Sequence, residues 1–128
     1  MFLDLEATFN KQLAQKYGID DTKFLVSLPA SGEEAFNIAE SFIRSGIVSL
    51  VILDSVAALL PEAEDKAAME QQSIGLQARL MSKALRKITP ICARNNCTFI
   101  FVNQIREKVG VLYGLEYKRF LTPINKIA

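Results

Sequence analysis

The feature that most constrains the fold is the run Leu-Val-Ile-Leu-Asp-Ser at residues 50–55. A short, continuous apolar run is typical of a strand buried inside a sheet, and this one stops at a carboxylate followed by a hydroxyl. In an open parallel α/β sheet, ligands bind at the carboxyl ends of the strands. Asp54 and Ser55 are therefore candidate ligand-binding residues, with Asp54 suited to Mg²⁺ held through water. The alternative is a core strand that simply ends at a polar residue.

Apolar runs and helical spacing divide the rest of the chain into alternating elements. The predicted strands cover residues 2–5, 24–28, 47–53 and 98–102. Helices are predicted for residues 8–17, closed by Gly18, and for the segment from the capping box Ser31–Glu34 to Gly46. A third, long helix has its apolar stripe at Ile74, Ala78, Met81, Leu85, Ile88 and Cys92. Pro90 is expected to kink or end this helix near Thr89.

This alternation predicts an α/β fold with a mostly parallel sheet of about four strands and flanking helices. The strands are apolar at consecutive positions, as is typical of strands covered on both faces. The chain has 128 residues, which is the size of one domain. Residues 115–128 show no clear period and are expected to form a loosely held tail.

Charge is divided unevenly along the sequence. Residues 1–70 carry 5 Lys and Arg against 12 Asp and Glu, a net charge of −7, whereas residues 71–128 carry 10 against 2, a net charge of +8. No acid occurs between Gln71 and Arg106. Such asymmetry indicates a surface for a polyanion, or two halves that neutralise each other across a packed interface.

The chain contains two cysteines, Cys92 and Cys97, and no histidine. Histidine-dependent triads are therefore excluded, and no paired spacing of zinc ligands is present. Both cysteines are expected to be small core residues. No apolar run approaches the ~18 residues of a membrane helix. Because residues 1–6 carry acids where a signal peptide carries bases, we expect a cytoplasmic protein.

Polar side chains follow three of the predicted strands. Glu6 follows the first, Asp54 and Ser55 follow the third, and the amides Asn103 and Gln104 follow the fourth. A glutamate near a metal-held triphosphate can deprotonate an attacking water, and an amide can hydrogen-bond a terminal phosphate. The alternative for each is an ordinary polar residue that meets water at a strand end.

The long helix carries a second pattern. Arg79, Lys83 and Arg86 share one face, opposite the apolar stripe and far from any acid in the sequence. Such a face binds phosphates without sequence preference, or it is simply a solvated helix surface. The segment 105–114 mixes basic, apolar and aromatic residues with glycines, which suits a loop that holds single-stranded nucleic acid, or the edge of a hairpin.

These segments together resemble the bacterial RecA recombinase family. The matching stretches are FLDLE (residues 2–6), SGEEA with IRSG, VILDSVAALLP, IGLQARLMSKALRK and FVNQIREKVGVLYG, in family order over roughly residues 1–114. The resemblance implies the central part of a RecA-like P-loop NTPase core, with residues 115–128 a divergent tail. It implies an ATP-dependent protein that binds single-stranded DNA for strand exchange in homologous recombination, DNA repair and the SOS response to DNA damage.

The resemblance also implies residue roles. Glu6 is the base that activates water, Asp54 with Ser55 is the Walker B position that holds Mg²⁺, and Gln104 senses the γ-phosphate of ATP. The implied partners are single-stranded DNA and further copies of the chain in a filament. Residues 66–73 resemble the first DNA-binding loop. The implied DNA-binding residues are Ile74, Gly75, Arg79, Ser82, Arg86, Arg106, Lys108, Val109 and Gly110.

The sequence also departs from the family pattern, and these departures matter as much for function as the matching stretches do. The chain contains no G-x-x-x-x-G-K-[ST] loop, whose backbone N–H groups and lysine bind phosphates. Asn10 and Leu13 stand where the family has an Asp and an aromatic residue beside adenine. We therefore expect no ATP hydrolysis by this chain alone. The open alternatives are a weak single-stranded-DNA-binding remnant and a non-functional truncated product, and the chain itself is a fragment, an eroded gene product or part of a split protein.

Overall fold

The computed structural model describes residues 1–59 and 70–104, with the backbone alone described for residues 70–75. The strands are β1 (Phe2–Asp4), β2 (Val26–Ser27), β3 (Leu50–Asp54) and β4 (Thr98–Phe101). The α-helices are α1 (Lys11–Lys16), α2 (Gly32–Arg44) and α3 (Glu70–Arg94), and two short 3₁₀ turns are η1 (Asp21–Lys23) and η2 (Val56–Ala58).

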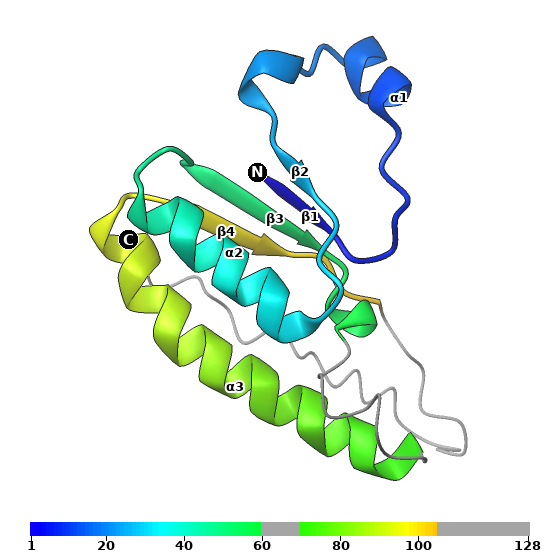
Figure 1. Cartoon of the computed structure of the whole chain (residues 1–128), viewed down its shortest axis with the longest axis vertical. Coiled ribbons are helices and arrows are strands. Elements are labelled where there is room, and N and C mark those ends of the chain that lie inside the picture. Colours follow the sequence, from blue (N-terminus) through cyan, green and yellow to red (C-terminus); the bar gives the residue numbers. More distant parts are fainter. Residues whose placement is uncertain (60–69, 105–128) are drawn as a thin grey trace, which may run out of the picture.

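The four strands form one parallel sheet in the order β2-β1-β3-β4 (Figure 1). The predicted α/β class and parallel sheet are therefore confirmed. All four predicted strands were longer than the observed ones. The excess is one residue at β1 and β4, whereas β2 contains only two residues and β3 begins at Leu50 rather than at residue 47. Ile47 is 71% exposed in the connection that precedes β3, so an apolar side chain alone did not make it part of the strand.

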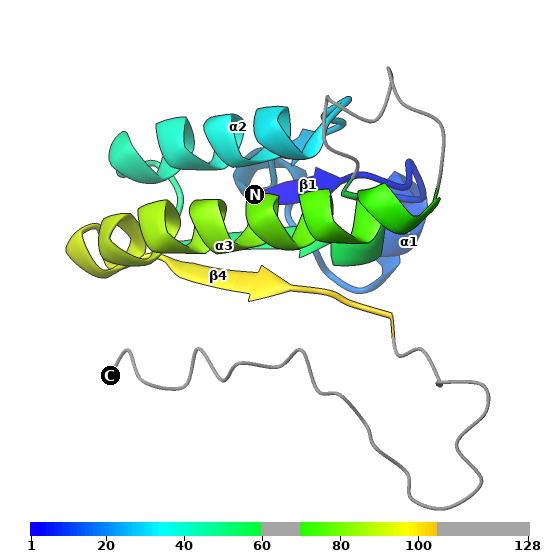
Figure 2. The same ribbon diagram turned by 90° about the horizontal axis from the view of Figure 1, so that it is seen from below.

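The prediction that both faces of the sheet are covered was wrong for the described residues. Helices α2 and α3 pack against each other and cover the same face, as Figures 1 and 2 show together. Leu3, Val51 and Leu53 lie on that face and are fully buried. On the opposite face, Leu50 and Ile100 remain 38% and 44% exposed. Burial therefore alternates along the strands with the two-residue period of a pleated sheet.

Helix α2 begins with the predicted capping box. The Ser31 hydroxyl accepts the backbone N–H of Glu34 at 3.1 Å, and the Glu34 carboxylate accepts the backbone N–H of Ala30 at 2.7 Å. These bonds satisfy donors that have no partner inside the helix. Gly32 lies where α2 closely approaches α3. A Cβ atom at this position would clash with the Leu80 side chain of α3, so the close approach requires glycine.

Pro90 was predicted to kink or end this helix near Thr89. Helix α3 runs through Pro90 to Arg94, so it does not end there. Arg86 and Pro90 are both exposed, so the proline removes a helical N–H donor on the solvent side of the helix. Packing of Ile88 and Ile91 on either side holds the helix together. The buried stripe also differs from the predicted one, since Ala78 is exposed and Ala84 is buried.

Helix α1 is shorter than predicted, because it begins after Asn10, whose side chain accepts the N–H of Leu13 at 3.0 Å. Phe9, Leu13 and Tyr17 stand at helical spacing, which predicts an apolar face, but that face is not packed in the core as a whole. Leu13 and Tyr17 are 49% and 80% exposed, and Ala14 is the buried residue of this helix. Local spacing correctly predicted a helix, but only the tertiary packing decided which side of it was covered.

Candidate functional site

The register between β1 and β3 brings two carboxylates together at the carboxyl end of the sheet. Asp4 is the register partner of Asp54, so the two residues occupy the same row on adjacent strands. Neighbouring strands lie ~4.8 Å apart. The backbone continues this pairing for one more residue, because the N–H of Leu5 donates to the Asp54 carbonyl at 2.8 Å. The segment that carries Glu6 therefore leaves the sheet directly beside Asp54.

Asp4 organises the loop that follows β1. Its side chain is 2% exposed and accepts three backbone N–H groups, from Glu6 at 3.2 Å, Thr8 at 3.2 Å and Phe9 at 2.8 Å. The loop turns through Ala7, whose φ of 53° lies in the left-handed region that costs a non-glycine residue about 1 kcal/mol. The hydrogen bonds to Asp4 offset this strain and fix where Glu6 leaves the sheet.

Glu6 and Ser55 are joined across the two strand ends. The Ser55 hydroxyl, 2% exposed, donates to Glu6 Oε1 at 2.6 Å, although the two residues are 49 positions apart in the sequence. The hydrogen bond leaves the second carboxylate oxygen of the exposed Glu6 available to a further donor such as water. We call Asp4, Glu6, Asp54 and Ser55 the acidic edge.

Burial raises the pKa of the Asp54 carboxyl, and the negative charges of Glu6 and Asp4 raise it further. Within the described residues, no Lys or Arg forms an ion pair with Asp54 or Glu6. The acidic edge therefore holds negative charge that no described side chain compensates. A bound cation would compensate it, and this excess of carboxylate oxygen fits Mg²⁺.

The same part of the chain contains no group of three or more ligating side chains that could enclose a metal ion. A site of this kind fits Mg²⁺ better than zinc, because Mg²⁺ keeps several waters and uses one or two carboxylates. Asp54 is the carboxylate best placed for that role.

Gln104 lies beyond β4 at the same end of the sheet. The chain after β4 stays paired as far as Val102, whose N–H donates to the Leu53 carbonyl at 2.9 Å and whose carbonyl accepts the N–H of Val56 at 2.8 Å. Gln104 follows two residues later and is exposed. The structure therefore brings Glu6, Asp54 and Ser55 together and leaves Gln104 further out along the same edge.

Helix α3 carries its cations outward. Arg79, Lys83 and Arg86 are all exposed, as is Ser82, and none of these cations forms an ion pair with a described carboxylate. We call Arg79, Lys83 and Arg86 the basic face. Lys87, in contrast, pairs with Glu40 of α2.

Along the axis of α3, the basic face begins at the level of η2, but it points away from η2. The Gln77 side chain donates to the Val56 carbonyl of η2 at 2.7 Å, and η2 directly follows β3. Arg79 lies two residues after Gln77, whereas Arg86 lies ~10 Å further along the helix at 1.5 Å per residue.

Some predicted site residues lie outside the described residues. These are Arg106, Lys108, Val109 and Gly110, together with residues 66–69 of the loop predicted for residues 66–73. Residues 70–73 of that predicted loop belong to α3 by their backbone. Ile74 and Gly75 belong to α3 by their backbone.

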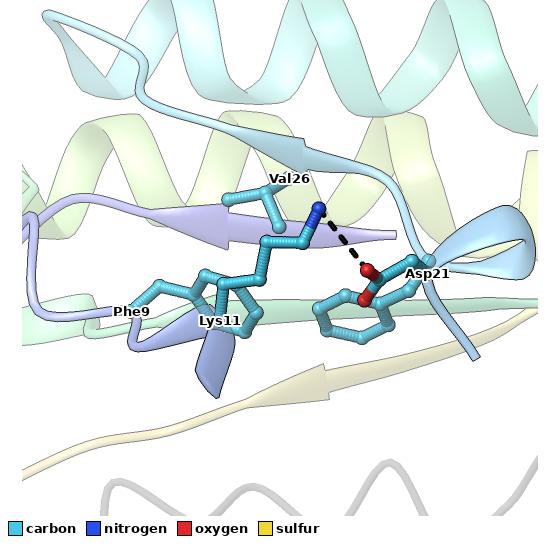
Figure 3. A pocket seen from close by; sticks show the side chains of 5 residues that line it. Phe9, Lys11, Asp21 and Val26 are labelled. Atoms are coloured by element: carbon cyan, nitrogen blue, oxygen red, sulfur yellow. Dashed lines mark ion pairs between the residues drawn. The ribbon is translucent and has the colours of Figure 1, made fainter. Parts of the chain in front are cut away.

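A small pocket of about 170 Å³ lies away from the acidic edge, between the segments around α1, η1 and β2. It is lined by Phe9, Lys11, Asp21, Phe24 and Val26, and Figure 3 shows the Lys11–Asp21 ion pair, 3.0 Å between Nζ and Oδ2, at its mouth. Ligand pockets are usually larger, ~300 Å³ or more. No residue of the acidic edge lines this pocket. The candidate site at the strand ends is therefore separate from the pocket.

Sequence reasoning missed two residues that build the site, Asp4 and Gln77. Asp4 had a local signal, since an aspartate two residues before a polar loop position commonly accepts backbone N–H groups. Gln77 had none, because its carbonyl acceptor on η2 lies 21 positions away.

The fold and the acidic edge define a class of protein. It is a parallel α/β domain with acidic side chains at the carboxyl ends of adjacent strands. The sequence profile of the RecA N-terminal domain matches residues 1–118, so this chain belongs to the RecA N-terminal domain family. Among the described residues, no helix is long and apolar enough to cross a membrane.

Individual relatives agree with this assignment. The chain is 50% identical to Protein RecA of Chloroherpeton thalassium and 51% identical to Protein RecA of Cytophaga hutchinsonii and of Acinetobacter baumannii, each over 113 residues. Each alignment covers 88% of this chain and 32% of the relative. The chain therefore spans about a third of the length of the curated relatives it matches.

Proposed function

We propose that this chain is the central segment of a RecA-type ATPase and single-stranded DNA-binding core that acts in recombination and DNA repair. The observation that carries the proposal is the 2.6 Å hydrogen bond between Ser55 and Glu6 beside Asp54 at the carboxyl edge of the sheet. It supports an arrangement in which one carboxylate is oriented for proton transfer and its neighbour is left to interact with a cation. Family membership supports the same arrangement. In this proposal the protein acts in the cytoplasm together with its DNA partner.

In this proposal the residues of the acidic edge divide the chemistry. Glu6 accepts a proton from the attacking water through the oxygen that Ser55 does not occupy. Asp54 holds Mg²⁺ through water, and bound Mg²⁺ supplies neutralisation of the charge on the phosphates. Gln104 hydrogen-bonds the terminal phosphate, and its exposure leaves it able to move with the segment that follows.

The isolated chain does not hydrolyse ATP in this proposal. Phosphate anchoring depends on a nest of backbone N–H groups and a lysine, and the sequence contains no loop of that kind. Positioning accounts for most of the catalysis of phosphoryl transfer, so Glu6 and Asp54 alone are insufficient. Phosphate release above background that disappears in Glu6→Gln would contradict this expectation.

Mn²⁺ in place of Mg²⁺ tests the cation site without requiring activity. Paramagnetic Mn²⁺ is expected to broaden the amide NMR signals of residues around Asp54, and Asp54→Asn is expected to abolish that broadening. Asp20 provides the matched control, because it is an exposed aspartate with its own acidic neighbour, Asp21. Equal broadening at Asp20 and Asp54, unchanged by Asp54→Asn, would show only diffuse attraction of cations and would remove support for the site.

A second function, weak binding of single-stranded DNA, is favoured by the basic face. Exposed cations without described acidic partners bind phosphates and release counterions, so affinity falls as salt rises. Fluorescence anisotropy with a labelled oligonucleotide at low and high salt measures this. We expect the double variant Arg79→Ala, Arg86→Ala to weaken binding, and Lys16→Ala on α1 to leave it unchanged.

Two outcomes would remove support for the DNA-binding function. One is the absence of binding at low salt, and the other is an equal loss of binding in Lys16→Ala. A thermal scan of the same preparation distinguishes a folded module from a non-functional product, because only the folded module unfolds cooperatively. Filament formation with further copies of the chain belongs to the same proposal, and light scattering with DNA present would measure it.

A further inference from the structure

The C-terminus of α3 ends in a tight hydrogen-bonded turn that leads into β4. The N–H of Cys97 donates to the Cys92 carbonyl at 3.0 Å, and Asn96 between them has a φ of 51°. This six-to-one bond, with a left-handed residue just before its donor, is the Schellman motif. The motif usually brings the side chains of its first and last residues into contact.

In this chain both of those residues are cysteines. Cys92 and Cys97 are 7% and 8% exposed, and both are free thiols. The pair lies in the core under the end of α3, and neither thiol belongs to the acidic edge or the basic face. The backbone turn, rather than chance packing, brings the two cysteines together at the end of α3.

We propose that Cys92 and Cys97 form a redox-modification site, which a low-molecular-weight disulfide converts into a reversible intrachain disulfide. The bond closes the last turn of α3 onto the first residues of β4. The inference depends on the turn geometry alone and is independent of the proposed ATPase and DNA-binding roles.

The reaction is two successive thiol–disulfide exchanges. The Cys97 thiolate attacks one sulfur of the external disulfide, forming a mixed disulfide and releasing one small thiolate. The Cys92 thiolate then attacks the Cys97 sulfur, forming the Cys92–Cys97 bond and releasing the second small thiolate. The protein loses two protons and two electrons, and the external disulfide is reduced to two thiols.

The order of attack follows from the surroundings of the two thiols. Burial raises the pKa of Cys92 to about 11. Burial also raises the pKa of Cys97, but the neighbouring Cys92 and the charge of the N-terminal ammonium group partly oppose that rise. Cys97 therefore forms the thiolate more readily and is the attacking residue, and the scarcity of thiolate makes the first exchange slow.

The test exposes the folded, reduced chain to oxidised glutathione, then alkylates the remaining thiols under denaturing conditions before mass spectrometry. The expected product has lost the mass of two hydrogen atoms and carries no alkyl group at either cysteine. Its melting temperature is expected to rise by a few degrees, since the closed loop is short, and to return on treatment with a reductant. Cys92→Ser and Cys97→Ser provide controls, because neither can form the intrachain bond.

Cys92→Ser is expected to stop at the mixed disulfide of Cys97. Three wild-type results would overturn the proposal. One is a mixed disulfide that persists, another is a disulfide-linked dimer as the main product, and the third is full alkylation of both thiols after long exposure in the folded state. The wild-type measurement does not depend on how well either variant folds.

Discussion

The acidic edge and the basic face carry opposite charges and are built in opposite ways. At the acidic edge, Asp4 and Ser55 are almost completely buried, and directed hydrogen bonds hold the Asp4 carboxylate and join Ser55 to Glu6. On the basic face, Arg79, Lys83 and Arg86 are exposed, and none has a described acidic partner. The first region holds single atoms in place, and the second presents charge over an extended surface.

This difference predicts how each region responds to substitution. Buried, hydrogen-bonded polar groups are costly to disturb, because the groups left behind lose their partners. Exposed cations contribute little to stability and add roughly independently to binding of a polyanion. Stability should therefore depend on the acidic edge, and salt-sensitive binding should depend on the basic face.

The largest effect is expected for Asp4→Ala. Three backbone N–H groups lose their acceptor, and at about 1 kcal/mol each the free energy of unfolding should fall by about 3 kcal/mol. Urea denaturation measures this change. Asp4→Asn keeps one side-chain oxygen and should lose less. A change below about 1 kcal/mol in Asp4→Ala would mean that water replaces the carboxylate, and the contrast between the two regions would not hold.

Ser55→Ala is expected to have a smaller but clear effect. It removes the hydrogen bond to the Glu6 carboxylate, and a bond to a charged group contributes about 1.5 kcal/mol. Urea denaturation again provides the measurement, with NMR shifts of the Glu6 side chain as a second observable. Ser55→Thr keeps the hydroxyl and is the matched control. Equal losses in both variants would indicate a steric effect instead.

Asp54→Asn is expected to stabilise the fold slightly at neutral pH. The folded-state pKa of Asp54 is raised, so the folded chain binds this proton more tightly than the unfolded chain and stability falls as pH rises through that window. Above the window the ionised carboxylate opposes folding, and asparagine removes that cost. Melting temperatures across pH measure the gain, which should vanish below the ordinary aspartate pKa of 3.8. A loss of stability in Asp54→Asn at neutral pH would contradict the conclusion that the ionised Asp54 carboxylate opposes folding.

The smallest effect on stability is expected for Lys83→Ala, within about 0.5 kcal/mol. The same change should lower the salt dependence of DNA binding by about 0.7 in the slope of log K against log salt, the value for one phosphate contact on a single strand.

Lys87→Ala is the matched comparison on the same helix, since Lys87 pairs with Glu40, whose side chain is 15% exposed. It should cost up to about 1 kcal/mol and change the slope less. The reverse pattern for the two lysines would contradict the distinction between paired and unpaired cations.

Much of the fold followed from local pattern. The capping box at Ser31 and the long apolar helix predicted α2 and α3, and the apolar runs that end at Asp54 and near Phe101 predicted two strands of a parallel sheet. Pro90 misled, because the cost of a lost helical hydrogen bond is smaller on a solvated side of a helix whose buried side stays packed. Leu13 misled because helical spacing does not indicate whether another element covers the face.

The candidate site followed from the sequence in part. Glu6, Asp54 and Ser55 were predicted from their places after strands, and the structure brings these three together. Asp4 was missed, although it fixes the loop that carries Glu6. Asp4 acts by accepting hydrogen bonds from three backbone N–H groups. The order of side chains in the sequence does not show where backbone N–H groups point.

The sequence by itself determined which segments become strands and helices, and therefore which polar residues stand at strand ends, because apolar spacing and caps act over a few residues. Only the tertiary structure decided that Asp4 lies beside Asp54, that Ser55 binds Glu6, and that Cys92 meets Cys97 through the turn between them. The physical reason is register and turn geometry. Parallel pairing joins residues about 50 positions apart and depends on the packing of the whole sheet, and the left-handed turn at Asn96 is a backbone conformation that the spacing of side chains does not record.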